Sequence, residues 1–95
     1  MTNIKINDKE YPCKVTFGAY SDFEEETGKN IGQINGISDS FRCVFYAIRR
    51  ECRKANIDFE WTFDEFCEMF TLEEVSMIIN EVFGSQKEEG QEKKR

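Results

Sequence analysis

The sequence has no histidine, a single proline and no apolar run near the roughly 18 residues that a membrane-spanning helix needs. Without histidine, a serine or cysteine nucleophile lacks its usual base, and zinc lacks its commonest nitrogen ligand. The chain also contains no G-x-S-x-G motif, no phosphate-binding glycine loop and no calcium loop of the D-x-[DN]-x-[DN]-G type. The first residues do not form the charged and then apolar start of a signal peptide. These absences predict a non-enzymatic, cytoplasmic protein with no catalytic residue, no cofactor, no metal ion and no contact with a membrane.

Positive charge is also scarce, because 13 Lys and Arg residues face 19 Asp and Glu residues and leave a net charge of −6. This balance disfavours nonspecific binding to nucleic acid, although a local basic patch can override it. The four cysteines, at positions 13, 43, 52 and 67, include no C-x-x-C pair. We therefore expect four free thiols that behave as small apolar residues.

The 95 residues suffice for one domain, and the pattern predicts an α+β fold that is mostly α, with an N-terminal β-hairpin packed on a small bundle of about four helices. Alternating apolar residues place the hairpin at residues 2–15. Apolar residues at steps of three and four place the helices at about 17–27, 38–56, 63–70 and 72–83. The T-x-x-E patterns that begin at Thr62 and Thr71 predict a capping box at the start of each of the last two helices. Residues 1–84 form the predicted single domain, and 85–95, which lack apolar residues, form a predicted disordered charged tail.

The predicted helix 17–27 carries Phe17, Tyr20, Phe23 and Thr27 on one stripe, with Thr16 as its cap and Gly28 as its end. Its three consecutive glutamates, residues 24–26, spread over roughly 200° of the helix circumference, so they cannot converge on one ion. We interpret them as a solvated face. A negative patch for a cationic partner is the functional alternative.

The long helix 38–56, with Ser38 as its predicted cap, is amphipathic. Its polar face is basic and includes Tyr46, and its apolar stripe comprises Phe41, Val44, Phe45, Ile48, Cys52 and Ala55. With five cations (Arg42, Arg49, Arg50, Arg53 and Lys54) against Asp39 and Glu51 the helix has a charge of +3, which leaves −9 for the rest of the chain. The sequence leaves three roles open for these cations. They are exposed and paired along the helix, they dock on an acidic surface of this protein or of a partner, or they bind nucleic acid. Trp61 follows in a connector, where it is either a contact residue or a lid. The candidate partner-binding residues are Arg42, Tyr46, Arg49, Arg50, Arg53 and Trp61.

The order of these parts resembles the tail assembly chaperones of long-tailed phages and prophages. The stretch IKINDKEYPCKVTFGAYSDFEEETGKNIGQI is followed by the long helix SDSFRCVFYAIRRECRKANIDFEWTFDEF and then by LEEVSMIINEVF. In that family, a first hairpin of the form I-x-I-N-x-K-E-Y precedes a short helix ending F-x-x-x-T-G. The resemblance covers about residues 3–83 and lies in the order and spacing of degenerate motifs.

The resemblance implies a non-enzymatic protein that binds the helical, hydrophobic tape-measure protein and keeps it soluble until tail-tube subunits polymerise around it. It also implies a place in the bacterial cytosol and absence from the mature virion. Self-association stays open. The alternative function is that of a small regulatory or inhibitory protein of a mobile element, which acts through protein or nucleic-acid contacts.

Overall fold

Two short strands, β1 (Thr2–Ile6) and β2 (Lys9–Cys13), form an antiparallel hairpin at the N-terminus. The computed structural model describes residues 2–94, and it describes the side chains of residues 2–84. Asn7 and Asp8 join the strands with φ angles of 52° and 68°. Two consecutive positive φ angles are what a tight two-residue hairpin turn needs, because they match the twist of the strands. The predicted hairpin is therefore confirmed, and its second strand ends at Cys13.

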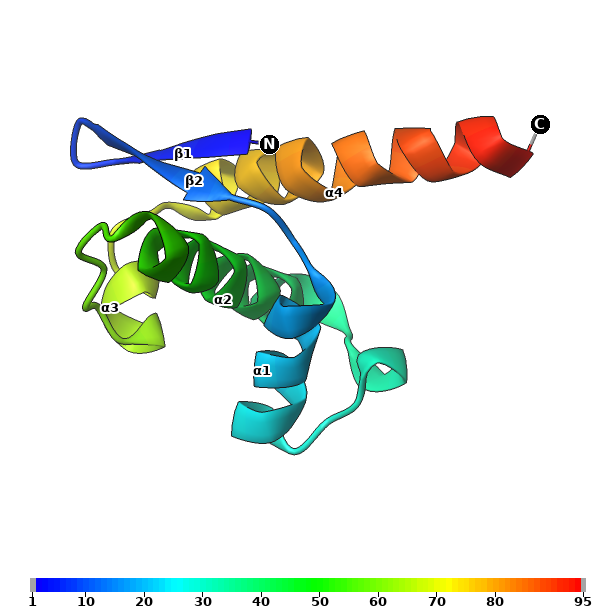
Figure 1. Cartoon of the computed structure of the whole chain (residues 1–95), viewed down its shortest axis with the longest axis horizontal. Coiled ribbons are helices and arrows are strands. Elements are labelled where there is room, and N and C mark those ends of the chain that lie inside the picture. The colour runs from blue at the N-terminus through cyan, green and yellow to red at the C-terminus, as the bar shows by residue number, and fades with distance from the viewer. Residues whose placement is uncertain (1, 95) are drawn as a thin grey trace.

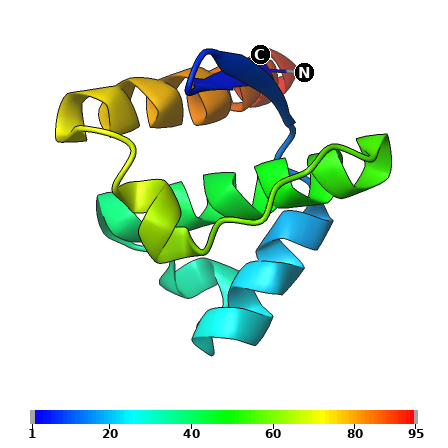
Figure 2. The same ribbon diagram turned by 90° about the vertical axis from the view of Figure 1, so that its left-hand side faces the viewer.

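Helix α2 (Gly36–Ala55) lies at the centre of the molecule. The hairpin and helix α4 (Leu72–Lys94) cover one side of α2, and helix α1 (Phe17–Thr27) covers the other (Figure 1, Figure 2). A two-stranded hairpin is barely stable alone, so α2 supplies the second layer against which it packs. The predicted α+β class, mostly α with an N-terminal hairpin, is confirmed.

Helix α2 starts two residues earlier than predicted. Its N-cap is Asn35 rather than Ser38, and the Asn35 backbone N–H donates a hydrogen bond to the Asp39 carboxylate at 3.0 Å. The helix ends where Asn56 adopts a left-handed φ of 63°, a conformation that asparagine tolerates. Ser38 therefore lies inside the first turn.

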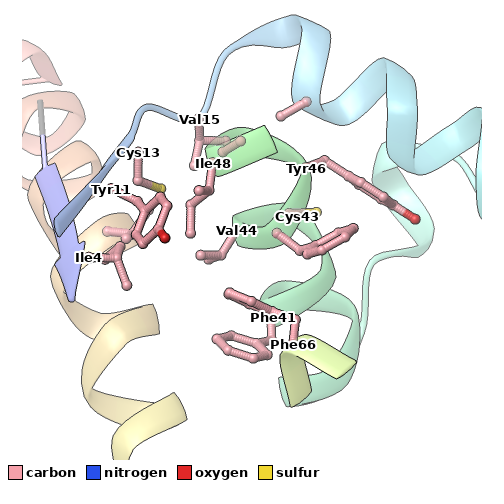
Figure 3. Packing of buried hydrophobic residues seen from close by; sticks show 14 of the residues in the cluster. Ile4, Tyr11, Cys13, Val15, Phe41, Cys43, Val44, Tyr46, Ile48 and Phe66 are labelled. Atoms are coloured by element: carbon pink, nitrogen blue, oxygen red, sulfur yellow. The ribbon is translucent and has the colours of Figure 1, made fainter. Parts of the chain in front are cut away.

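Helix α2 buries two faces, whereas the sequence pattern indicated one. Five residues of the predicted stripe, Phe41, Val44, Phe45, Ile48 and Cys52, are buried, whereas its last residue, Ala55, is exposed at the end of the helix. Cys43, Tyr46 and Ala47 are fully buried as well. Figure 3 shows Tyr46 leaving α2 on the side away from the hairpin. The prediction that Tyr46 shares an open face with the arginines is wrong, because α1 covers that side of α2.

Helix α1 was predicted at the correct residues, but its apolar face is rotated. Ala19, Asp22 and Phe23 are buried against α2, whereas Phe17 is 77% exposed. Thr16 occupies the N-cap position without a capping hydrogen bond from its side chain. Gly28 has a φ of 79° and ends the helix, as predicted. The stretch that follows contains a short 3₁₀ turn, η1 (Ile31–Gln33).

Two reciprocal capping boxes start helices α3 (Phe63–Cys67) and α4. The Glu65 backbone N–H donates to the Thr62 hydroxyl at 3.1 Å, and the Thr62 backbone N–H donates to the Glu65 carboxylate at 2.9 Å. The pair Thr71 and Glu74 repeats this arrangement at 3.2 and 2.8 Å. Both boxes were predicted, because the pattern T-x-x-E satisfies two orphan backbone N–H groups at once.

The ends of these two helices differ from the prediction. Helix α3 ends at Cys67 rather than at residue 70. Helix α4 continues to Lys94, so Gly84 does not end it, since the φ angle of Gly84 is not in the left-handed region that stops a helix. The disordered tail predicted for residues 85–95 falls outside the residues whose side chains are described, so it stays a prediction.

The core lies between the hairpin and α2 and extends to α3. Tyr11 of the hairpin faces Val44 and Ile48 of α2 (Figure 3). Phe66 of α3 stacks on Phe41 of α2, with 4.8 Å between ring centroids and 23° between ring planes. The five-residue helix α3 is too short to be stable in isolation, so this aromatic packing holds it in place.

Candidate partner-binding surfaces

The arginine face of α2 comprises Arg42, Arg49, Arg50 and Arg53, and two of these side chains, Arg49 and Arg50, meet acidic side chains of α1. Arg50 Nε and Nη2 donate to the two carboxylate oxygens of Asp22 at 2.9 and 3.1 Å. Arg49 Nη2 lies 2.6 Å from Glu26 Oε2 and 3.6 Å from Asp22 Oδ2. Of the alternatives that the sequence left open, docking on the protein's own acidic surface applies to Arg49 and Arg50.

Asp22 is the centre of this cluster. The hydrogen bond from the Arg50 guanidinium lowers the pKa of Asp22, because it stabilises the ionised carboxylate and outweighs the opposing effect of burial. The same hydrogen bond raises the pKa of Arg50. Gly18 leaves room for this contact, since a Cβ atom at that position would lie 2.7 Å from Arg50 Nη1. The cluster therefore attaches α1 to α2.

Arg42 and Tyr46 also interact within the domain. The Arg42 guanidinium lies 4.2 Å from the ring centroid of Phe63, and its Nη1 donates to the Tyr46 hydroxyl at 3.1 Å. The ring of Tyr46 in turn lies 4.9 Å from the Arg49 guanidinium. Burial raises the pKa of Tyr46, although the hydrogen bond from Arg42 opposes the shift. A fully buried Tyr46 has no surface to offer a partner in this conformation.

The two remaining candidates lie apart from this cluster. Arg53 is exposed in the last turn of α2, where a cation interacts favourably with the helix dipole. Trp61 is half-buried and packs edge-to-face on Tyr11 and Phe59, with centroid distances of 5.8 and 5.3 Å. This packing matches the lid interpretation of Trp61 better than the contact interpretation.

The three consecutive glutamates on α1 are exposed, as predicted for a solvated face. Glu26 also forms the ion pair with Arg49 described above. The negative patch on α1 is thus partly neutralised by the cations of α2. Neither charged surface is fully free for a partner.

Sequence reasoning missed a surface at the start of α4, which we call the α4 surface. It comprises the exposed side chains of Leu72 and Met77, each 69% exposed, and two open hollows beside them. One hollow, of about 240 Å³, lies between α2, α3 and α4 and is lined by Ile37, Phe63 and Leu72, among others. Exposed large apolar side chains that gather around hollows are typical of binding surfaces.

The second hollow has a volume of about 270 Å³ and lies between β1 and α4. Met77 and Ile78 line it from α4, and Ile4 lines it from β1. Phe70 lines both hollows, so the two adjoin each other at this ring. The α4 surface therefore extends over both sides of the first turns of α4.

Two features of the sequence point to this surface. The first feature is Met77, a large apolar residue that lies off the apolar stripe of its helix. Leu72 lies on that stripe and was assigned to the core, but it is exposed. Residues 57–84 also contain eight acidic residues and no Lys or Arg. The eight are Asp58, Glu60, Asp64, Glu65, Glu68, Glu73, Glu74 and Glu81.

All four cysteines are free, as predicted. Cys13, Cys43 and Cys52 are buried and Cys67 is partly buried. Burial, with a smaller contribution from the nearby Glu51 carboxylate, raises the pKa of the Cys13 thiol to about 12. Burial likewise raises the pKa of Cys43 to about 11. A thiol with such a pKa is protonated at neutral pH and is a poor nucleophile.

Within the described residues, no group of three or more acidic or cysteine side chains is placed to hold a metal ion. No helix in that part of the chain is both long enough and apolar enough to cross a membrane. No protein-family model, curated protein or solved structure matches this chain.

Proposed function

We propose that this protein is a tail assembly chaperone of a long-tailed phage or prophage, which binds the tape-measure protein and keeps it soluble before the tail tube polymerises. The observation that supports this proposal most directly is the α4 surface, where Leu72 and Met77 are each 69% exposed beside two hollows. A chaperone for a hydrophobic helical protein needs such a surface. The order of hairpin, short helix and long helix that carries the family resemblance adds support.

The proposed role is non-enzymatic and belongs in the host cytosol, before the virion is complete. We expect the partner to contact the α4 surface, whereas the sequence pattern placed the contact on the arginine face. Arg49 and Arg50 contact Asp22 and Glu26, so a partner or a nucleic acid would have to displace α1 side chains to use them. The alternative of a regulatory protein that acts through these arginines consequently has less support.

The test is co-expression with the tape-measure protein encoded in the same phage or prophage. We expect this chain to move the tape-measure protein from the pellet to the soluble fraction and to co-purify with it. A matched control co-expresses the tape-measure protein with an unrelated acidic domain of similar size. If the tape-measure protein stays insoluble and does not co-purify, the proposed function is wrong.

A further inference from the structure

We propose that the α4 surface binds one amphipathic helix whose apolar face is flanked by Lys or Arg side chains. The identity of the natural partner rests on the proposed function, since that function assigns the bound helix to the tape-measure protein. The chemistry of the partner is derived independently from the α4 surface itself.

The apolar side chains of the α4 surface are exposed beside two hollows. The two hollows lie on either side of the first turns of α4 and adjoin at Phe70, while Leu72 and Met77 stand beside them. A helix that docks on a groove inserts side chains spaced three, four or seven residues apart, and it covers the apolar side chains at the rim. Leu72 and Met77 are such rim side chains, because Leu72 lines one hollow and Met77 lines the other.

Acidic side chains surround the α4 surface. Glu74 and Glu81 line the hollow beside β1, and Glu73 is exposed next to Leu72. Asp64 and Glu68 are exposed on and just after α3. No cation comes from residues 57–84, and a partner with a cationic flank would therefore be attracted while an acidic one would be repelled.

Two cations from other elements reduce this negative charge without reversing it. Lys5 of β1 lines the hollow beside β1, and Arg42 of α2 lies over the ring of Phe63. Five carboxylates against these two cations keep the region acidic. A second copy of this chain is a poor occupant, since a symmetric contact would bring the same acidic surface against itself.

The experiment uses two synthetic peptides of about 18 residues, a length at which a designed helix is stable enough to form. Both carry the same Leu-rich apolar face, but one has Lys at the flanking positions and the other has Glu. Binding to the full chain is measured by fluorescence anisotropy at low and at physiological ionic strength. We expect the Lys peptide to bind at least about tenfold more tightly than the Glu peptide, with a difference that narrows as salt screens the charges.

Variants locate the binding site. The double change Leu72→Ser and Met77→Ser should weaken binding of the Lys peptide about tenfold or more, as expected when two contact side chains are truncated. The control is Phe17→Ser, which removes an apolar side chain of similar exposure from α1. Glu73→Lys with Glu81→Lys should weaken the Lys peptide and strengthen the Glu peptide, whereas Glu24→Lys on α1 should change neither.

Several outcomes would overturn the inference. These are equal affinity for both peptides, no binding of either, or unchanged affinity after the Leu72 and Met77 changes. A concentration-dependent dimer that disappears with Leu72→Ser would make a second copy the occupant. If the peptides bind as expected but the tape-measure protein stays insoluble, the surface stands and the proposed function fails. If the Leu72 and Met77 variant still solubilises the tape-measure protein, the function stands and this surface is wrong.

Discussion

Replacing Asp22 by Asn tests whether the acidic side chains of α1 hold that helix on α2. The change keeps the shape of the side chain and removes its charge. Asp22 is only 8% exposed, it accepts two hydrogen bonds from Arg50, and Arg49 lies 3.6 Å away. Hydrogen bonds to charged groups contribute about 1.5–3 kcal/mol to the free energy of unfolding.

The lower end of this range applies, because the Arg50 side chain is 39% exposed and water can replace part of the lost contact. We therefore expect Asp22→Asn to lower the free energy of unfolding by about 1.5 kcal/mol at pH 7. For a domain of this size, that corresponds to a fall in Tm of roughly 6–12 °C. Urea denaturation followed by the fluorescence of Trp61 and by far-UV circular dichroism measures the change.

The loss of stability caused by Asp22→Asn also depends on pH, because the pKa of Asp22 is lowered in the folded protein. The unfolded carboxyl titrates at about 3.9, and the folded one titrates below that value. Its contribution to stability is therefore fully present above about pH 5 and is lost as the pH falls through the folded pKa. As the pH falls through this range, the difference in free energy of unfolding between the native protein and the Asp22→Asn protein should shrink.

The control for this experiment is Glu24→Gln, a change of the same kind at an exposed position on α1. Its effect should stay within about 0.5 kcal/mol, as is usual for surface substitutions. The reasoning is refuted if Asp22→Asn is no more destabilising than Glu24→Gln at pH 7. It is also refuted if the loss caused by Asp22→Asn is the same at pH 3 as at pH 7.

Two further predictions concern Gly18, which lies against Arg50, and the buried cysteines. Gly18→Ala should raise the free energy of unfolding by about 0.5–1 kcal/mol in the Asp22→Asn protein, because alanine favours the helix more than glycine does. It should not do so in the native sequence, where the added methyl group meets the Arg50 guanidinium that Asp22 holds in place. A double-mutant cycle in urea checks this, and an equal effect in both backgrounds would contradict it. In the native protein at pH 8, Cys67 should react with iodoacetamide first and Cys13 last, because the Cys13 thiol is buried and has a pKa of about 12. Mass spectrometry of quenched samples measures the order, and equal rates at the two thiols would argue against it.

Several features that depend on neighbours in the chain were predicted correctly, although the cap at Ser38 and the helix end at Gly84 were not. The hairpin turn at Asn7 and Asp8 and the capping boxes that begin at Thr62 and Thr71 each satisfy backbone groups within four residues. Such local hydrogen bonding is encoded by residue type and spacing, and the rest of the molecule is not needed to see it. The fold class followed, because these elements leave few ways to bury the remaining apolar stripes.

The faces of the helices were predicted less well. Phe17 was assigned to the core and is exposed, whereas Tyr46 was assigned to an open face and is buried. Periodicity shows which residues share a face of a helix, but it does not show how many neighbours that helix has. Because α2 lies between the hairpin and α1, it buries a second face that contains polar as well as apolar side chains.

The sequence by itself determined the order and type of the secondary-structure elements, the free state of the cysteines and the separation of charge between α2 and the rest of the chain. Only the tertiary structure decided what those charges do. Asp22 and Arg50 are 28 residues apart, and folding α1 onto α2 brings them within 2.9 Å. The same folding leaves Leu72 and Met77 outside the core. Interactions between residues distant in the chain depend on how whole helices pack, and no local pattern specifies that.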